Sequence, residues 1–513
     1  MQRGTAPIEH VDVLIVGAGI SGIGAACYLR RERPQTSFAI LEARTATGGT
    51  WDLFRYPGIR SDSDLHTFGY AFKPWVNDKA IAGADSILAY VRETAAEHQI
   101  DRHIRLSHAV RGAAWSSETS TWLVDIERTD SGKRIQMSCR WLFCASGYYR
   151  YDQGFRPRFP GEERFEGTLV HPQHWPEDLD YTGKRVVVIG SGATAITIVP
   201  AMAERAAHVT MLQRTPSYVV PAPTEDKLAN WLRSWLPPTW AYELTRRKNI
   251  ARNGAIWRFC RAYPTLARAA IRAINASQLP AGYPVDKHFN PPYAPWDQRL
   301  CMVADGDLFK AIRDGRASVA TDQIATFTER GVQLSSGEVL EADIVVTATG
   351  LNILPFGGMA LAVDGAPVNV AECVAYKGIM LSGVPNFAFA IGYTNASWTL
   401  KVGLLCEHFC HLLAHMDAHQ YTSCTPELRD PSMPTKSLLA FGAGYVQRAV
   451  GQLPRQGDRA PWMVSTSYEA DAKLLSLEAV ADPNLRFATQ AQPRRDEHRE
   501  PAPVTPLRAA RAT

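Results

Sequence analysis

The chain has 513 residues, which is enough for two or three domains with sizeable cores. Hydrophobic residues make up 46% of it and charged residues 21%, and a net charge of only +4 gives no general case for nucleic-acid binding. The nine cysteines are scattered and form no CxxC pair, which argues against a disulfide framework, a zinc ribbon and a dithiol redox centre. No signal-peptide pattern opens the sequence, and the uncharged stretch 378–400 contains a proline and glycines that disfavour a membrane span. We therefore expect a cytoplasmic protein.

The first predicted elements form a βαβ unit. An apolar run at 11–16 predicts a buried strand, a helical pattern follows from about 20 to 31, and "FAILEAR" predicts a second strand. Glycines in the intervening turn let the backbone approach a pyrophosphate at the helix N-terminus, where free N–H groups and the helix dipole favour anions. Glu42 stands at the end of the second strand, where a carboxylate binds the hydroxyl groups of a ribose. The turn itself is a GxGxxG motif made by Gly17, Ala18, Gly19, Ile20, Ser21 and Gly22.

A connecting region follows this unit. The sequence "GGTW", which includes Gly49, Thr50 and Trp51, comes after the acidic strand and can bring backbone close to a cofactor. Residues 121–147 are expected to form a hairpin with a turn at 130–132, followed by a returning strand. The stretch "RFEGTLVHPQHWPED" contains two His, one Trp, two Pro and one Gly, so it predicts neither a plain helix nor a plain strand.

A second βαβ unit is predicted at 185–214. At the strand end that corresponds to Glu42 it carries Arg214, which suits the 2′-phosphate of NADPH. Two dinucleotide sites in one chain most commonly serve electron transfer from a nicotinamide to a flavin. We therefore assign the first unit to the ADP half of FAD and the second to NADPH. The turn of the second unit is formed by Gly190, Ser191, Gly192, Ala193, Thr194 and Ala195.

Residues 228–279 are helical by composition. They contain nine Lys or Arg residues, one acidic residue and four Trp. Such a composition suits peripheral contact with an anionic membrane at the inner face. We favour the alternative, a helical insertion that covers the active site and lines the substrate entry.

The C-terminal part contains a candidate metal face. Two Cys and three His at i, i+4 spacing could share one side of a helix, but nothing ties a further ligand to them. We therefore expect an amphipathic helix beside the flavin and no metal. A buried strand is expected at 339–351, and the Pro-rich, charged tail 491–513 is expected to be disordered. The candidate metal residues are Cys406, Cys410, His411, His415 and His419.

The unusual segment before the second unit carries a family resemblance. Its residues Phe165, Gly167, His171, Trp175 and Pro176 fit the pattern F-x-G-x-x-x-H-x-x-x-W-P. This pattern resembles the fingerprint of Baeyer–Villiger monooxygenases, which also lies between two Rossmann motifs. Related N- and S-oxygenases more often have Tyr or Phe at the Trp position.

The resemblance extends beyond the fingerprint. The stretches 48–75, 171–181, 290–313 and 391–401 look like the ethionamide-activating monooxygenase subfamily, and the likeness covers most of residues 8–490. It implies an α/β fold with two Rossmann-like dinucleotide-binding domains. The FAD domain is expected at 1–160 and 335–490, and the NADP domain at 161–334 with a helical insertion at about 225–295. In this arrangement His171 and Trp175 hold the domains in register and take no part in the chemistry.

The resemblance also implies the catalytic residues. Arg299 in "DQRL" matches the family's catalytic arginine, and a fixed guanidinium can stabilise both a peroxide anion and a later oxyanion. Asp62 matches the active-site aspartate that would hold Arg299, and Asp64 is the competing candidate. The family usually has Arg-Cys-Asp where this chain has Arg-Ser-Asp at 60–62. Many family members have a Lys that helps to bind the 2′-phosphate where this chain has Gln298. The preference for NADPH therefore depends more on Arg214.

The function implied by the resemblance is a Baeyer–Villiger oxidation. NADPH reduces FAD, O2 forms a flavin C4a-peroxide, and attack on a ketone gives an ester or lactone. The hydroperoxide form would oxidise sulfur in thioamides and thioethers. Two alternatives remain: an N- or S-oxygenating flavin monooxygenase without ketone activity, and a non-oxygenating protein that binds FAD and NADP as a redox sensor. Trp175 argues against the first and Arg299 against the second.

Overall fold

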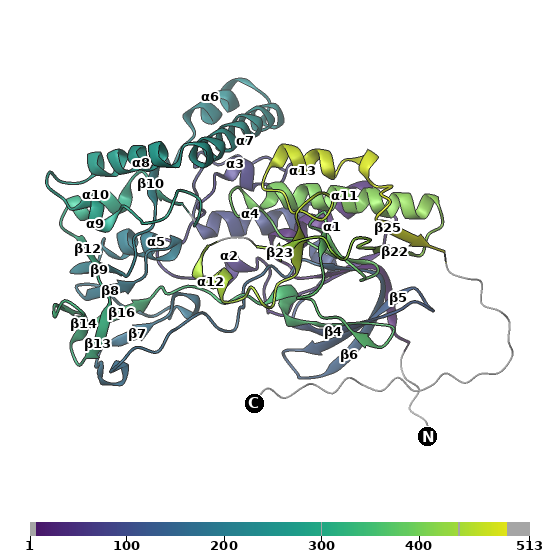
Figure 1. The fold of residues 1–513 in the computed structure, drawn as a ribbon, viewed down its shortest axis with the longest axis horizontal. Coiled ribbons are helices and arrows are strands. Elements are labelled where there is room, and N and C mark those ends of the chain that lie inside the picture. The colour runs from purple at the N-terminus through teal and green to yellow at the C-terminus, as the bar shows by residue number, and fades with distance from the viewer. Residues whose placement is uncertain (1–6, 299, 440–441, 490–513) are drawn as a thin grey trace.

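The computed structural model describes residues 7–298, 300–439 and 442–489. The chain forms two α/β domains that lie side by side (Figure 1). The first domain is built on an eleven-stranded sheet and the second on a five-stranded sheet. This confirms the expected α/β fold with two Rossmann-like units. The tail predicted at 491–513 lies outside the described residues.

The first sheet has the order β18-β17-β4-β5-β6-β1-β2-β3, with β19, β20 and β21 attached. Strand β1 runs parallel to both β2 and β6. Its side chains alternate between two cores: Val13 and Ile15 pack with the helices on one face, and Leu14 and Val16 pack on the other face. Burial on both faces explains the continuous apolar run that predicted this strand. The bounds are β1 (Glu9–Val16), β2 (Phe38–Leu41), β3 (Ile104–Arg105), β4 (His108–Ser116), β5 (Thr121–Arg128), β6 (Arg134–Cys144), β17 (Ala360–Val363), β18 (Ala366–Pro367), β19 (Ala375–Tyr376), β20 (Met380–Leu381) and β21 (Phe387–Phe389).

Two long helices cover one face of this sheet. They are α1 (Ile20–Glu32), which is the helix predicted from about 20 to 31, and α11 (Trp398–Ala418). The two helices pack against each other and against the parallel strands. The predicted hairpin turn is also present, since β5 and β6 are antiparallel neighbours and Gly132 between them has a φ of 67°.

The second sheet is entirely parallel, with the order β12-β9-β8-β16-β7. Helices α5 and α10 share a core with one face, and a small three-stranded sheet covers the other. The bounds are β7 (Thr168–Val170), β8 (Arg185–Ile189), β9 (His208–Gln213), β12 (Ala317–Thr321), β16 (Ile344–Thr347), β13 (Ile324–Thr328), β14 (Gly331–Leu334), β15 (Val339–Glu341), α5 (Ala193–Met202) and α10 (Asp307–Arg313).

The expected domain boundary at 334–335 differs from the structure. Residue 335 lies in the turn between β14 and β15, and the following strand β16 pairs with β7 and β8 of the second sheet. The chain therefore returns to the first domain only after Thr347. An apolar strand alone does not indicate which of two sheets it joins, which explains the early boundary.

Two stretches of chain connect the domains, and they lie side by side. Residues 148–155 lead into the second domain, and 350–354 lead back. They are antiparallel: the N–H of Arg150 donates to the carbonyl of Asn352 at 2.8 Å, and that of Phe155 donates to the carbonyl of Gly350 at 3.0 Å. The two domains are thus joined by a hydrogen-bonded pair of segments.

The predicted helical insertion is present, and its helices α6 and α7 project at the top of Figure 1. It consists of α6 (Lys227–Trp235), α7 (Pro238–Ala262), α8 (Pro264–Gln278) and the short α9 (Val285–His288). Although the insertion lies between strands of the second domain, α7 is anchored to the first. Arg246 is buried and donates to the carbonyls of His66, Thr67 and Gly69 at 2.9–3.1 Å, around the end of α3 (Leu65–Phe68).

The C-terminal segment packs against α11. Lys401 of α11 and Asp471 are both buried and form an ion pair at 2.8 Å, and the hydroxyl of Tyr393 donates to the same carboxylate at 2.6 Å. Within the described ranges, no helix is long and apolar enough to span a bilayer. The remaining elements are α2 (Thr50–Leu53), α4 (Ala84–Glu97), α12 (Gly444–Gln447), α13 (Tyr468–Leu474), β10 (Val219–Ala222), β11 (Cys301–Ala304), β22 (Ser423–Pro426), β23 (Thr435–Ser437), β24 (Arg455–Gly457) and β25 (Leu485–Ala488), with 3-10 turns η1 (Asp101–His103), η2 (Glu162–Arg164), η3 (Pro172–His174), η4 (Pro355–Gly358) and η5 (Leu477–Ala479).

Candidate active site

A cavity of about 780 Å³ extends between the two domains. Its wall contains the β1–α1 turn, the end of β2, the loops 48–51 and 60–63, the connection 145–152 and the N-terminus of α5. The cavity therefore extends from the first glycine turn to Ala193 and Thr194 at the start of α5, whereas Gly190, Ser191 and Gly192 of the second turn are not among its lining residues. Predicted site residues that line it are Gly17, Gly19, Ile20, Ser21, Glu42, Gly49, Thr50, Trp51, Asp62, Ala193 and Thr194.

The first glycine turn forms a backbone cradle. Gly17 has a φ of 103°, and a Cβ on Gly22 would lie 1.9 Å from the carbonyl oxygen of Gly17, so neither position admits a side chain. Gly19 caps α1 without a side-chain hydrogen bond. A Cβ on Gly49 would lie 3.1 Å from the Cα of Gly19. Two strips of bare backbone thus flank the cavity at a helix N-terminus. These residues fit the pyrophosphate of a dinucleotide.

The carboxylate of Glu42 is fixed beside this cradle. Its two oxygens accept hydrogen bonds from the backbone N–H of Ala18 at 2.8 Å and of Arg44 at 2.9 Å, and the residue is only 6% exposed. Burial raises the pKa of Glu42, and the two backbone donors oppose that shift. The position is the one expected for a carboxylate that binds ribose hydroxyl groups.

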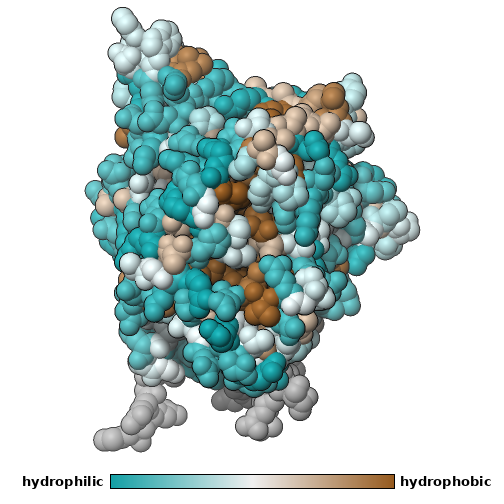
Figure 2. Space-filling view, turned by 90° about the vertical axis from the view of Figure 1, so that its left-hand side faces the viewer, coloured by the Kyte–Doolittle hydropathy of each residue, from teal (hydrophilic) through white to brown (hydrophobic). Residues whose placement is uncertain are grey.

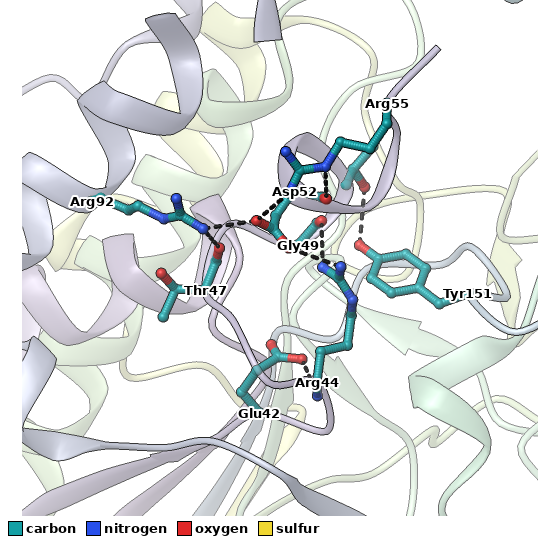
Figure 3. A network of polar contacts seen from close by, with 9 residues as sticks. Glu42, Arg44, Thr47, Gly49, Asp52, Arg55, Arg92 and Tyr151 are labelled. Carbon is teal, nitrogen blue, oxygen red and sulfur yellow. Dashed lines mark hydrogen bonds and ion pairs between the residues drawn. The ribbon is translucent and has the colours of Figure 1, made fainter. Parts of the chain in front are cut away.

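A network of arginines around Asp52 holds the second strip of backbone (Figure 3). The buried carboxylate of Asp52 pairs with Arg44 at 2.8 Å, Arg92 at 2.7 Å and Arg55 at 3.1 Å. Arg44 also donates to the carbonyl of Gly49 at 3.3 Å, so the network fixes the GGTW loop. The sequence analysis missed this cluster, because one of its arginines, Arg92, is distant in the sequence and no motif marks the other two.

Tyr151 closes the cradle from the interdomain connection. Its hydroxyl lies 3.0 Å from the hydroxyl of Thr50, and burial raises the pKa of Tyr151 to about 12. Both residues line the cavity. The first of the two connecting segments is therefore part of the nucleotide site.

The structure separates the two candidate aspartates. Asp62 is half-buried and lines the cavity. Asp64 caps α3 through the N–H of Thr67 at 3.1 Å and accepts from the amide of Asn249 in α7 at 3.0 Å, so its carboxylate has a structural task. This arrangement favours Asp62 as the residue that faces the chemistry.

Arg299 lies outside the described residues. The chain on its C-terminal side reaches the cavity wall at Met302. Arg60, two residues before Asp62, also lines the cavity and forms a bidentate pair with Asp307 at the start of α10, at 2.5 and 3.2 Å. This pair joins the domains at the cavity edge.

The second glycine turn has the same construction as the first. Gly190 has a φ of 137°, and a Cβ there would lie 2.3 Å from the carbonyl oxygen of Ala348. Gly192 caps α5, with open space around the position of a Cβ. Ser191 donates to the carbonyl of Thr215 at 3.0 Å, which holds the end of β9 against the turn. The neighbouring Arg214 is exposed there, in a position that suits a 2′-phosphate.

The fingerprint residues divide into two groups. Phe165 packs edge-on against Phe327 with ring centroids 6.0 Å apart, and a Cβ on Gly167 would lie 2.5 Å from the carbonyl oxygen of Asp343. Both are packing positions inside the second domain. Trp175 is half-buried against the core of the same domain, and Pro176 is exposed.

His171 faces the interdomain connection. A Cβ on Gly154 would lie 2.1 Å from its Cε1, and its Nδ1 accepts from the N–H of Gln173 at 3.2 Å. Gln173 in turn donates to the carbonyls of Arg150 and Tyr151 at 2.8 Å. The described cavity wall includes none of the fingerprint residues. This geometry is that of a segment that supports the connection between the domains.

The candidate metal face belongs to α11. Cys406 and Cys410 are buried in the core, and burial raises the pKa of both thiols. The rings of His415 and His419 lie with their centroids 4.3 Å apart and are tilted by 39° to each other. No group of three or more His, Cys, Asp or Glu side chains in the described part of the chain could hold a metal ion. All nine cysteines of the chain are free and buried.

Comparison with known proteins bears on this site. The model of a flavin-binding monooxygenase-like family matches residues 75–229, and that of an NAD(P)-binding Rossmann-like domain matches residues 15–78. The chain is 50% identical to the FAD-containing monooxygenase EthA of Mycobacterium tuberculosis, over 94% of its own length and 99% of that protein. It is 48% identical to EthA of Mycolicibacterium smegmatis, over 93% and 97% of the two lengths.

Solved structures support the fold. A steroid monooxygenase bound to NADP superposes with a TM-score of 0.74 at 22% identity, over 94% of this chain and the whole of that one. At this identity the match bears on the arrangement of the domains and leaves the substrate open.

Proposed function

This chain belongs to the family of FAD-containing, flavin-binding monooxygenases, and from that premise we propose that it catalyses a Baeyer–Villiger oxidation. It would use NADPH and O2 to insert one oxygen atom beside a ketone carbonyl, giving an ester or lactone. Family membership brings FAD and NADPH to the chain as cofactors. The observation that carries the proposal is the cavity of about 780 Å³, which extends from the first glycine turn to the N-terminus of α5 in the second domain.

Bound FAD supplies the electrons, taken from NADPH, that activate O2. The chain holds and orients the cofactors. The N-terminus of α1 and the bare backbone at Gly19 and Gly49 would bind the pyrophosphate, and Glu42 would bind the ribose. At the other side of the cavity, Thr194 at the N-terminus of α5 and the exposed Arg214 would hold the second nucleotide.

One residue would act on the reacting atoms and a second would position it. Arg299 is proposed as the donor that stabilises negative charge developing on oxygen in a site from which water is excluded. Asp62, which lines the cavity, would orient that guanidinium. The guanidinium keeps its charge at every working pH, so it needs no proton transfer to perform this role.

The same site would oxidise sulfur in thioamides and thioethers. The competing function is an N- or S-oxygenating enzyme that does not accept ketones. Trp175 favours ketone oxidation, because the fingerprint of the N- and S-oxygenases more often has Tyr or Phe there. A redox-sensing protein that does not oxygenate is the third possibility.

One experiment separates these functions. Photoreduced holoenzyme with NADP⁺ is mixed rapidly with O2, and the flavin absorbance is followed with and without ketones or methyl phenyl sulfide. We expect a transient absorbance that decays faster with a ketone, and an ester in the products. Faster decay with the sulfide alone would assign the chain to the S-oxygenases. Direct reoxidation with hydrogen peroxide as the sole product under every condition would refute oxygenation.

A further inference from the structure

The hairpin of α6 and α7 carries large apolar side chains that face solvent. On α6, Leu228, Trp231 and Trp235 follow helical spacing along one face and are 47%, 58% and 76% exposed. On α7, Trp240 is 68% exposed and Leu244 is 45% exposed. An amphipathic helix normally buries such a face, so this one has its apolar stripe turned outward.

The other side of the hairpin is firmly attached, so this exposure is a property of the fold. Arg233 of α6 donates to the carbonyl of Val76 and pairs with Asp78 in the first domain. At the base, Lys248 of α7 pairs with Asp226 at 2.6 Å. With the buried Arg246 these contacts fix the orientation of both helices. The exposed stripe is thus presented outward by the rest of the molecule.

The surroundings of the stripe are basic. Residues 228–279 contain nine Lys or Arg residues and one acidic residue, Glu243, and three of the basic residues, Arg233, Arg246 and Lys248, make the anchoring contacts of the hairpin. Glu243 is itself paired with Arg247 at 2.7 Å. Arg252 and Arg258 are exposed further along α7. Figure 2 shows pale and brown residues among hydrophilic ones at the top of the molecule, where this insertion projects.

We propose that the α6–α7 hairpin docks on the surface of an anionic lipid bilayer, with Trp231, Trp235 and Trp240 in the headgroup region. Indole rings prefer that depth, because one edge is apolar and the N–H finds polar partners. The exposed Arg252 and Arg258 of α7 would be attracted by anionic headgroups. A projecting two-helix tip is convex, and lipids can close around such a shape. A stable contact with a second copy of the chain would instead need a complementary interface of about 800 Å² on each partner.

The docking surface is linked to the cavity through α7. Arg246 of α7 holds the carbonyls at the end of α3, and Phe68 of α3 lines the cavity. A bilayer contact would therefore place the oxygenase beside the phase in which apolar substrates dissolve. The docking itself does not depend on which substrate is oxidised.

The test uses the full-length holoenzyme and sedimentation with vesicles. One set is phosphatidylcholine alone, and in the other about a third of the lipid is phosphatidylglycerol. We expect the protein to bind the anionic vesicles and to release with added salt. Changing Trp231, Trp235 and Trp240 together to Ser should lower the partition coefficient about tenfold or more, with FAD content and NADPH oxidation unchanged.

The matched control is Leu477→Ser, which removes a 63% exposed apolar side chain outside the hairpin and should bind as wild type does. Three results would overturn the proposal. In the first, the wild type remains in the supernatant with anionic vesicles. In the second, the triple variant binds these vesicles as well as the wild type does. In the third, light scattering shows that the wild type is an oligomer and the triple variant is not, while vesicle binding is the same for both. The last result would assign the stripe to a second copy of the chain.

Discussion

The glutamate at the end of β2 allows a quantitative test of the FAD site. In Glu42→Gln the side chain keeps its size but loses its charge and one acceptor. Both carboxylate oxygens accept from backbone N–H groups at 2.8 and 2.9 Å, so the amide would leave one buried N–H without a partner. An unsatisfied buried donor costs about 1–3 kcal/mol, which should lower the thermal stability of the apoprotein. The lost charged hydrogen bond to the ribose is worth about 1.5–3 kcal/mol, or about 10- to 150-fold in the Kd for FAD.

The assay removes FAD and titrates it back, following the quenching of flavin fluorescence, and measures thermal unfolding of the apoprotein. Glu9→Gln is the matched control, because Glu9 lies at the other end of β1 in an exposed pair with Arg105. Such a pair contributes at most about 1 kcal/mol and should leave the Kd unchanged. A Kd of Glu42→Gln for FAD within about threefold of the wild-type value would refute the ribose assignment. Unchanged apoprotein stability would refute the role assigned to the two backbone donors.

Four other changes test the rest of the site. Arg299→Ala should still oxidise NADPH but release hydrogen peroxide and form about 10²–10³-fold less ester, because a charged donor to developing negative charge is lost. Asp62→Ala should cost less in the same coupled assays, since it acts through the guanidinium. Arg214→Ala should raise the KM for NADPH and leave that for NADH nearly unchanged, because it removes a contact with the 2′-phosphate. Burial lowers the pKa of His408 to about 3, so below about pH 6.5 the unfolded chain binds a proton that the folded chain excludes. Between pH 7 and pH 5 the wild type should therefore lose about 2 kcal/mol more stability than His408→Asn, as measured by urea unfolding.

The expectations for Arg299, Arg214 and His408 each have a clear contrary result. Near-normal ester formation by the Arg299 variant would show that another group stabilises the oxyanion. Equal losses with NADPH and NADH would make Arg214 a structural residue. The carbonyl of Leu475 lies 3.1 Å from Nδ1 of His408, and an Asn amide can replace that donor. Parallel pH profiles for wild type and His408→Asn would therefore contradict a neutral, buried imidazole.

The local parts of the fold could be predicted from the sequence. The strands that precede Gly17 and Gly190 were predictable because an apolar run, a glycine turn and a helical pattern follow one another within a short stretch. The sheet to which β16 belongs could not be predicted, because an apolar strand does not indicate which strands it pairs with. The expected return to the first domain at 335 was wrong for this reason.

Contacts between distant residues account for what the sequence analysis missed in the site. The resemblance favoured Asp62 but left Asp64 as a competing candidate, and the residue that binds the carboxylate of Asp64 is the distant Asn249 in α7. Arg246 looked like part of a basic surface but is buried against backbone carbonyls. A guanidinium bound by carbonyls at a helix end leaves no charge pattern that could be recognised in the sequence.

The paired segments between the domains bear on the order in which the protein folds. The first sheet cannot be completed until β21 pairs with β6, where Phe387 lies opposite Leu142. At about 5–20 residues per second, a ribosome needs on the order of tens of seconds to make the chain between them. All five strands of the second sheet are synthesised within that interval. Once that domain has formed, it holds residues 150 and 352 together. The long connection between β6 and β21 then acts as a short loop, so the entropy cost of pairing these two strands falls. We therefore expect the inserted domain to act as the template on which the interrupted sheet closes.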